Sequence, residues 1–124
     1  MRSWIRGLCV GLLLSAATSA SAASILIFGD SISAAYGLEI RQGWVSLLTQ
    51  RLEQQAPGRH QVINASVSGE TTSGGLLRLP ALLAQHKPDL VVLELGANDG
   101  LRGQPPALGV GDAVKVFASG DAGD

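Results

Sequence analysis

Three short apolar runs, at residues 25–28, 62–65 and 90–95, dominate the pattern of hydrophobic and polar positions along the chain. Within these runs the hydrophobic residues do not alternate with polar ones. This pattern is typical of strands that are buried on both faces of a parallel sheet. We therefore predict three buried β-strands at these positions.

The two segments between these runs carry apolar residues at helical spacing. The first is expected to form a helix that ends at Pro57-Gly58 and packs through Trp44, Leu47, Leu48 and Leu52. The second is expected to begin at a threonine or serine and to pack through Leu76, Leu79 and Leu83. We expect Pro80 in the first turn of this helix or at a kink, because proline lacks the N–H that a helix interior needs.

Alternation of strands and helices predicts an α/β fold with parallel strands, right-handed crossovers and helices on both faces of the sheet. Ligands of such sheets bind beyond the carboxyl ends of the strands. Three loops leave those ends, reading "GDSIS" (29–33), "SVSGETT" (66–72) and "GANDG" (96–100). If the strand order begins 2-1-3, as in flavodoxin-like sheets, these loops meet, because neighbouring strands lie roughly 5 Å apart.

Residues 1–22 have the features of a cleaved export signal. Two arginines precede a short apolar run, and the segment closes on Ala20-Ser21-Ala22, the small-x-small pattern of a cleavage site. The apolar run is shorter than the roughly 20 residues that a membrane-spanning helix needs, so we expect no stable membrane insertion after cleavage. An uncleaved N-terminal anchor is the alternative. A periplasmic or secreted location follows from the export signal.

Cleavage would also change the composition of the chain. The only cysteine, Cys9, leaves with the signal, so no disulfide is expected. Two arginines and no acidic residue are lost, which makes the exported chain more acidic than the full sequence with its net charge of −1. No cluster of lysine and arginine remains, and this excludes nucleic acid as an expected partner.

Each of the three loops offers one residue that suits acyl transfer. A Gly-x-Ser turn that opens a helix can expose Ser31 as a nucleophile, although serine is also a common helix cap. Gly69 can bring its N–H close to a reacting carbonyl oxygen, or serve only as a turn glycine. Asn98 can donate its amide to the same oxyanion, or close a turn on its own backbone. Asp30 and Asp99 are interpreted as turn and capping residues.

The loop sequences "GDSIS", "SVSGETT" and "GANDG" resemble, in order, the first three sequence blocks of the SGNH (GDSL) hydrolases. The likeness runs over residues 25–106, and the stretch from Asn64 to Gly103 resembles the periplasmic acyl-thioesterase, lysophospholipase and arylesterase subgroup. The resemblance implies that Ser31 is the nucleophile and that its N–H, Gly69 and Asn98 form the oxyanion hole. It also implies a flavodoxin-like three-layer α/β/α sandwich, here incomplete at its C-terminal side.

The sequence departs from this family where the general base should lie. The family takes its base from an Asp-x-x-His block near the C-terminus, and these 124 residues contain no such block. The two histidines, His60 and His86, precede the second and third predicted strands and so belong to the opposite edge of the sheet. Residues 107–124 are rich in Gly, Ala and Asp and are interpreted as a divergent, disordered tail. The abrupt end of the likeness suggests a shifted reading frame or a truncated gene.

Three hypotheses follow for a chain divided into a signal (1–22), an N-terminal part of a hydrolase domain (23–106) and a tail (107–124). The first is an exported serine hydrolase of small acyl esters or thioesters, inactive or very weak as given. The second is a non-catalytic acyl-binding remnant. The third is a phosphate binder that uses "GDSIS" at a helix N-terminus, which the absence of nucleotide-binding glycine motifs disfavours. No cofactor and no metal site are predicted.

Overall fold

The computed structural model describes residues 21–105, in which strands and helices alternate along the chain. The elements are β1 (Ser24–Gly29), the 3-10 helix η1 (Ile40–Gln42), α1 (Trp44–Gln55), β2 (Gln61–Asn64), α2 (Thr72–His86), β3 (Leu90–Glu94) and α3 (Ala97–Leu101). The three predicted strands and the two predicted helices are thus confirmed within one or two residues. Most of the expected signal and the tail at 107–124 lie outside the described residues.

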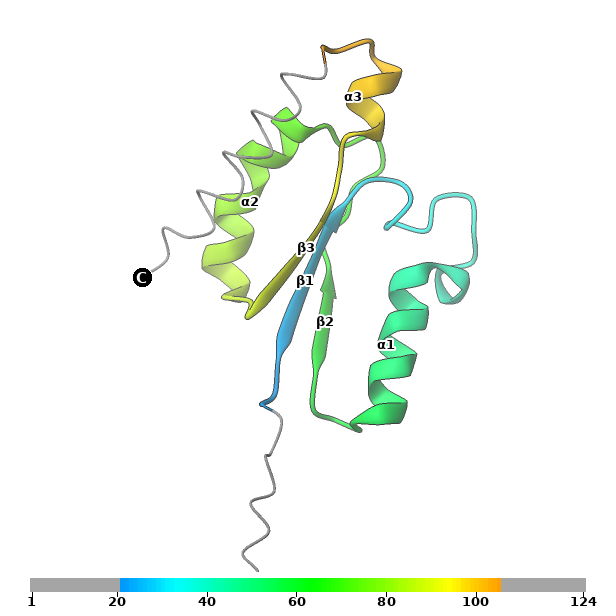
Figure 1. The fold of residues 1–124 in the computed structure, drawn as a ribbon, viewed down its shortest axis with the longest axis vertical. Helices are drawn as coiled ribbons and strands as arrows, with labels where there is room; N and C mark the ends of the chain where they lie inside the picture. Colours follow the sequence, from blue (N-terminus) through cyan, green and yellow to red (C-terminus); the bar gives the residue numbers. More distant parts are fainter. Residues whose placement is uncertain (1–20, 106–124) are drawn as a thin grey trace, which may run out of the picture.

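The three strands form one parallel sheet in the order β2-β1-β3 (Figure 1). Ile25 of β1 lies opposite Val62 of β2 and Leu90 of β3. The predicted 2-1-3 order is therefore confirmed, and all three carboxyl ends point to the same edge of the sheet. In the described part of the chain, β2 and β3 each pair on one side only.

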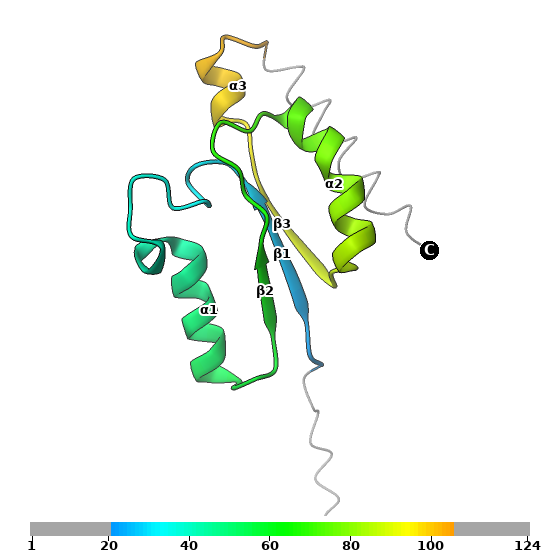
Figure 2. The same cartoon turned by 180° about the vertical axis from the view of Figure 1, so that it is seen from behind.

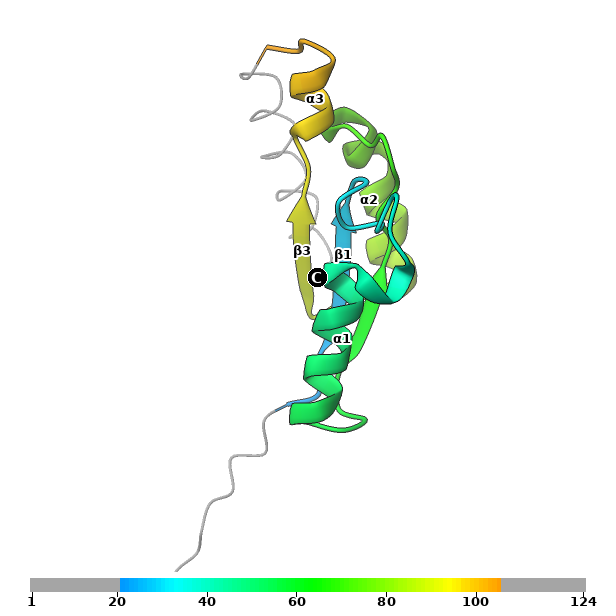
Figure 3. The ribbon, with the colours of Figure 1, turned by 90° about the vertical axis from the view of Figure 1, so that its right-hand side faces the viewer.

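The sheet is covered by one long helix on each face, since α1 and α2 lie on opposite sides of the strands in Figure 1 and α1 lies in front of the sheet in Figure 3. Leu26 and Phe28 of β1 pack with Leu79 of α2, whereas Ile25 and Ile27 pack with Val45 of α1. Four of these β1 and α2 side chains, Leu26, Ile27, Phe28 and Leu79, are almost wholly buried. The central strand β1 is therefore apolar on both sides because each side meets a different helix.

Two details of the helices differ from the sequence prediction. Leu47 is 53% exposed, so the buried face of α1 is made by Trp44, Val45, Leu48 and Leu52 without it. Pro80 lies in the interior of α2, so the first-turn placement is wrong and the kink stays as the other expectation. Thr71 caps α2 as expected, since its side chain accepts a hydrogen bond from the Gly74 N–H.

Candidate active site at the carboxyl edge of the sheet

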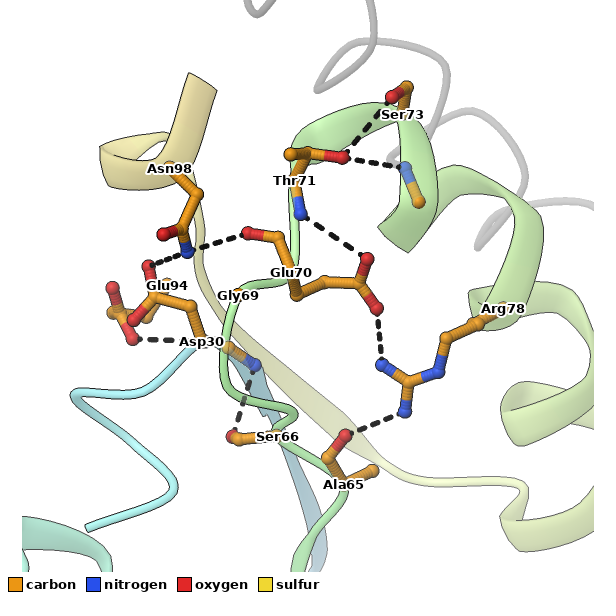
Figure 4. Close-up of polar contacts among 12 residues, drawn as sticks. Asp30, Ala65, Ser66, Gly69, Glu70, Thr71, Ser73, Arg78, Glu94 and Asn98 are labelled. Carbon is orange, nitrogen blue, oxygen red and sulfur yellow. Dashed lines mark hydrogen bonds and ion pairs between the residues drawn. The ribbon is translucent and has the colours of Figure 1, made fainter. Parts of the chain in front are cut away.

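The loops that follow β1, β2 and β3 meet beyond the carboxyl ends of the strands. Figure 2 shows α3, the start of α2 and the loop after β1 gathered at this end of the molecule. One side chain connects all three loops, because Asn98 Nδ2 lies 2.9 Å from the carbonyl oxygen of Glu70 and 3.4 Å from Oδ2 of Asp30 (Figure 4). Asp30 directly precedes Ser31, and Glu70 directly follows Gly69. The three residues that the resemblance singles out therefore lie on loops that are bonded to one another.

Ser31 follows β1 in a tight turn and does not open a helix, so that part of the sequence prediction is wrong. Residues 31–37 form turns, and the α-helix begins only at Trp44. The turn is closed by hydrogen bonds from the Ala34 N–H to the Asp30 carbonyl (2.9 Å) and from the Tyr36 N–H to the Ser31 carbonyl (3.0 Å). The absence of a helix at this loop removes the geometric basis for a helix-capping role of Ser31 and for a phosphate site at a helix N-terminus.

Two polar groups of Ser31, its N–H and its hydroxyl, have no protein partner in the described part of the chain, whereas its carbonyl accepts the Tyr36 N–H. Neither its N–H nor its hydroxyl makes a hydrogen bond with residues 21–105, and the residue is half-buried. Asp30 shapes the backbone instead, since its Oδ1 accepts the Ile32 N–H at 3.0 Å. The interpretation of Asp30 as a turn residue is thereby confirmed, and the Ser31 hydroxyl is left available to a base or a substrate.

The loop that carries Ser31 is fixed through its neighbour Ser33, which is 2% exposed. Ser33 Oγ donates to Oε2 of Glu94 at 2.8 Å and accepts from Nε1 of Trp44 at 3.1 Å. Its carbonyl oxygen accepts from Nδ2 of Asn64 at 2.8 Å. β2, β3 and α1 thus all hold the same loop residue.

Gly69 occupies a turn that only glycine adopts without strain. Its φ is +82°, and the Glu70 N–H donates to the Val67 carbonyl at 3.1 Å across the turn. The Gly69 carbonyl accepts from Nη2 of Arg102 at 3.1 Å, while the Gly69 N–H makes no hydrogen bond with residues 21–105. Gly69 therefore is a turn glycine, the alternative that the sequence left open, and its N–H has no acceptor among residues 21–105.

Asn98 lies in the short helix α3, and its side chain is already engaged. One amide hydrogen is directed at the Glu70 carbonyl in a bond of normal length, and the contact with Asp30 is long at 3.4 Å. An incoming oxygen can compete for the second hydrogen at small cost, because a hydrogen bond weakens as it lengthens. The amide is therefore held in place by one bond and retains donor capacity for another.

Three polar residues at this edge were not singled out in the sequence. Glu94 interrupts the third apolar run and could have been noticed as a carboxylate inside a predicted buried strand. Glu70 and Arg78 form an ion pair at 2.6 Å across eight residues, and no motif marks that pairing. Asp99, by contrast, is interpreted from the sequence as a turn or capping residue, and its carboxylate does bind the first residue of α2: Oδ1 accepts the Thr72 N–H at 2.9 Å and Oδ2 accepts the Thr72 hydroxyl at 2.6 Å.

Both histidines lie at the opposite edge of the sheet, as predicted. His60 directly precedes β2 and accepts the Ala23 N–H on its Nδ1 at 3.2 Å, while His86 ends α2 before β3 begins. A strand of five residues is roughly 17 Å long, so neither imidazole reaches the loop that carries Ser31. Residues 21–105 contain no cluster of three or more His, Cys, Asp or Glu side chains that could hold a metal ion. Over the same residues, no helix is long and apolar enough to cross a membrane.

Fold and site together define a parallel α/β protein that presents a serine and several hydrogen-bond donors at the carboxyl edge of its sheet, an arrangement that serine hydrolases use. The sequence profile of the GDSL-like lipase/acylhydrolase family matches residues 27–117. The chain belongs to this family, and the resemblance inferred from the three loop motifs is confirmed.

Named relatives agree with this assignment. The chain is 54% identical over 107 residues to Esterase TesA of Pseudomonas aeruginosa strain PAO1, a match that covers 86% of this chain and 52% of the relative. It is 48% identical over 88 residues to Thioesterase 1/protease 1/lysophospholipase L1 of Escherichia coli K12, covering 71% and 40% of the two chains. The crystal structure of TesA superimposes with a TM-score of 0.76 at 52% identity, over 80% of this chain and 54% of that one. The chain thus spans about half the length of the curated relatives it matches.

Proposed function

We propose that this chain supplies the nucleophile and the oxyanion hole of a serine acyl hydrolase. Ser31 Oγ attacks the carbonyl carbon of an acyl ester or thioester. The N–H groups of Ser31 and Gly69 and the side-chain amide of Asn98 donate to the oxygen, which becomes negatively charged in the tetrahedral intermediate. The observation that carries the proposal is the Asn98 amide, which bonds to the residues adjoining Ser31 and Gly69 on the other two loops.

The hydrogen-bonding pattern of the backbone N–H groups supports the proposed oxyanion hole. The N–H groups of Ser31 and Gly69 have no acceptor within residues 21–105, although the surrounding loops are extensively hydrogen-bonded. Donors that are fixed in place but unpaired stabilise a developing charge without a reorganisation cost. A substrate carbonyl oxygen would be the acceptor that these groups lack.

An acyl substrate is favoured by the apolar side chains that follow Ser31 on the same loop. Four of them are exposed to solvent: Ile32 (60%), Tyr36 (78%), Leu38 (57%) and Ile40 (78%). Exposed apolar groups gathered in one segment are typical of a surface that binds an apolar partner. The names of the relatives, an esterase and a thioesterase/lysophospholipase, are consistent with small acyl esters and thioesters as substrates.

We expect the 124 residues by themselves to be a very weak enzyme. A serine hydroxyl is a poor nucleophile until a base removes its proton, and the sequence contains only His60 and His86, both at the wrong edge of the sheet. This placement also favours a second candidate function, a non-catalytic acyl-binding remnant that retains the oxyanion pocket. Export through the segment at 1–22 to the periplasm or the medium completes the proposal.

The test is hydrolysis of p-nitrophenyl butyrate by the purified chain and by its Ser31→Ala and Asn98→Ala variants, with Ser46→Ala on α1 as the matched serine control. Without a base, Ser31 contributes little, so Ser31→Ala should lower the rate less than Asn98→Ala does. Removing one oxyanion donor typically costs about 10²–10³ in kcat. The Ser46→Ala control should retain the full rate.

An extended version of the chain tests the role of Ser31 directly. Extension with a family-like C-terminal half that carries an Asp-x-x-His block should raise turnover strongly and make it fully dependent on Ser31. No gain in folded fusion protein would contradict the assignment of Ser31 as nucleophile. Robust turnover by the short chain, abolished by Ser31→Ala, would instead mean that a base lies within these residues, with His86 the first to replace. Absence of turnover together with binding of butyrate would support the remnant.

A further inference from the structure

Arg78 of α2 holds both ends of the loop that presents Gly69. Its Nη1 donates to Oε2 of Glu70 at 2.6 Å and its Nη2 donates to the carbonyl oxygen of Ala65 at 2.9 Å (Figure 4). Its guanidinium also lies over the ring of Phe28, 5.1 Å from the ring centroid. One side chain thus spans the loop from its first residue after β2 to the residue before the cap of α2.

We propose that Arg78 is a positioning residue for the oxyanion hole, an inference that rests on the proposed function. Arg78 touches none of the reacting atoms. It acts through Glu70, whose carbonyl oxygen accepts the Asn98 amide at 2.9 Å and whose backbone adjoins Gly69. A shift of Glu70 would therefore displace two of the three proposed donors together.

The geometry requires arginine at this position. Two different nitrogens of one planar guanidinium reach two acceptors at the two ends of the loop, and its Cζ lies over the Phe28 ring. A lysine ammonium is a compact charge on a flexible stem, without the fixed fork that reaches two separated acceptors or the flat face that stacks on the ring. Lysine would keep the charge but could not hydrogen-bond to Ala65 and Glu70 at the same time.

The surroundings of Glu70 explain why its displacement would be transmitted to the donors. The Glu70 side chain is only 9% exposed, and its Oε1 also accepts the Thr71 N–H at 3.2 Å, next to the cap of α2. The middle of the loop is bonded to β1, because the Val67 N–H donates to the Gly29 carbonyl at 3.0 Å and Ser66 Oγ accepts the Gly29 N–H at 3.1 Å. The Gly69 carbonyl accepts from Arg102 at 3.1 Å. Arg78 is the side chain that binds both ends of the loop, at Ala65 and Glu70.

A purely structural ion pair and a positioning residue make different kinetic predictions. Loss of a structural pair lowers stability but leaves kcat of the folded fraction unchanged. Loss of a positioning residue misplaces donors that act in the transition state, so kcat falls while KM stays nearly constant. The decrease should be smaller than that for removal of a donor, because the donors are still present.

The experiment uses the full chain, expressed with its own leader, and its Arg78→Lys, Arg78→Ala and Glu70→Gln variants. Arg51→Ala, which removes an exposed arginine of α1, is the matched control. With p-nitrophenyl butyrate we expect Arg78→Lys to lower kcat about tenfold and to change KM less than about twofold. Removal of an oxyanion donor would lower kcat by about 10²–10³. Guanidinium ion added at millimolar concentration should partly restore Arg78→Ala, and ethylammonium should not.

Hydrogen exchange read by mass spectrometry supplies a measurement that does not depend on turnover. Peptides that cover residues 64–71 should exchange faster in Arg78→Lys and Glu70→Gln than in the parent, whereas α1 peptides should not change. Unaltered exchange at 64–71, or a kcat equal to that of the parent in folded Arg78→Lys, would overturn the proposal. A parent chain that does not hydrolyse the ester would favour the acyl-binding remnant over the enzyme, and the exchange comparison would then decide alone whether Arg78 fixes the loop.

Discussion

Replacement of Ser33 by alanine should destabilise the fold far more than a serine-to-alanine change usually does. Ser33 is 2% exposed and its hydroxyl connects two other side chains, donating to Glu94 at 2.8 Å and accepting from Trp44 at 3.1 Å. Alanine would keep the backbone bond to Asn64 but would leave a carboxylate oxygen and an indole N–H without this partner. Glu94 would retain only the long contact of 3.4 Å with the Asp30 N–H.

The size of the effect follows from the two bonds that are lost. A hydrogen bond to a charged group contributes about 1.5–3 kcal/mol and a neutral one about 1 kcal/mol. Ser33→Ala should therefore lower the free energy of unfolding by about 2–4 kcal/mol, a large part of the roughly 5–15 kcal/mol typical of whole domains. A loss of this size multiplies the unfolded fraction by about 30 to 1,000.

Urea unfolding followed by the fluorescence of Trp44 is the direct assay. A chain that lacks residues 1–22 would have Trp44 as its only tryptophan, because the other one is Trp4. Ser46→Ala on α1 is the control and should change the unfolding free energy by less than about 0.5 kcal/mol. Measurement at two protein concentrations separates unfolding from association. A loss below about 0.5 kcal/mol in Ser33→Ala would refute the reasoning that Ser33 fixes the Ser31 loop.

Three further predictions concern the leader, the sheet edge and the helix cap. Exported protein should begin at or next to Ala23, and N-terminal sequencing that finds Met1 outside the cytoplasm would contradict this. The exported chain should associate through β3, because the second edge of this strand is unpaired within residues 21–105. Light scattering should then show species larger than the monomer. A monomer with a sharp, reversible thermal transition would count against this prediction. Thr71→Ala should cost about 1 kcal/mol in urea unfolding, because it removes the side-chain cap of α2, and an unchanged midpoint would contradict that role.

Strands, helices and strand order could be predicted because they depend on periodic patterns of apolar residues. The runs at 25–28, 62–65 and 90–95 alternate with helical segments along the chain. This order predicts a parallel sheet covered by helices on both faces. The predicted packing of the first helix was partly wrong, because helical spacing alone does not determine whether a side chain faces the sheet or the solvent. Leu47 has helical spacing yet faces solvent, since α1 needs only one stripe of side chains to cover Ile25 and Ile27.

The local structure at Ser31 shows the limit of motif reasoning. A glycine-x-serine sequence after a strand suggested a helix, but the chain turns through residues 31–37 because Ser33 is held from three sides. Those partners lie 11, 31 and 61 residues away in the sequence. No local propensity encodes contacts of that range, so the loop conformation could not be read from the motif.

Long-range contacts also explain how three weak local signals give one site. From the sequence, Ser31, Gly69 and Asn98 each have an ordinary structural alternative on their own loops, and of the three Gly69 does adopt the turn that its alternative requires. The coupling between the loops is what distinguishes the site, because the Asn98 amide joins Asp30 to Glu70 over 68 and 28 residues. Bonds of this kind link the loops that carry the three proposed site residues. In the proposed mechanism a general base would have to approach from the same edge of the sheet, because α1 and α2 pack against the two faces of β1. The proposed function therefore predicts that activity requires an imidazole at the carboxyl edge, where the Ser31 hydroxyl has no partner among residues 21–105.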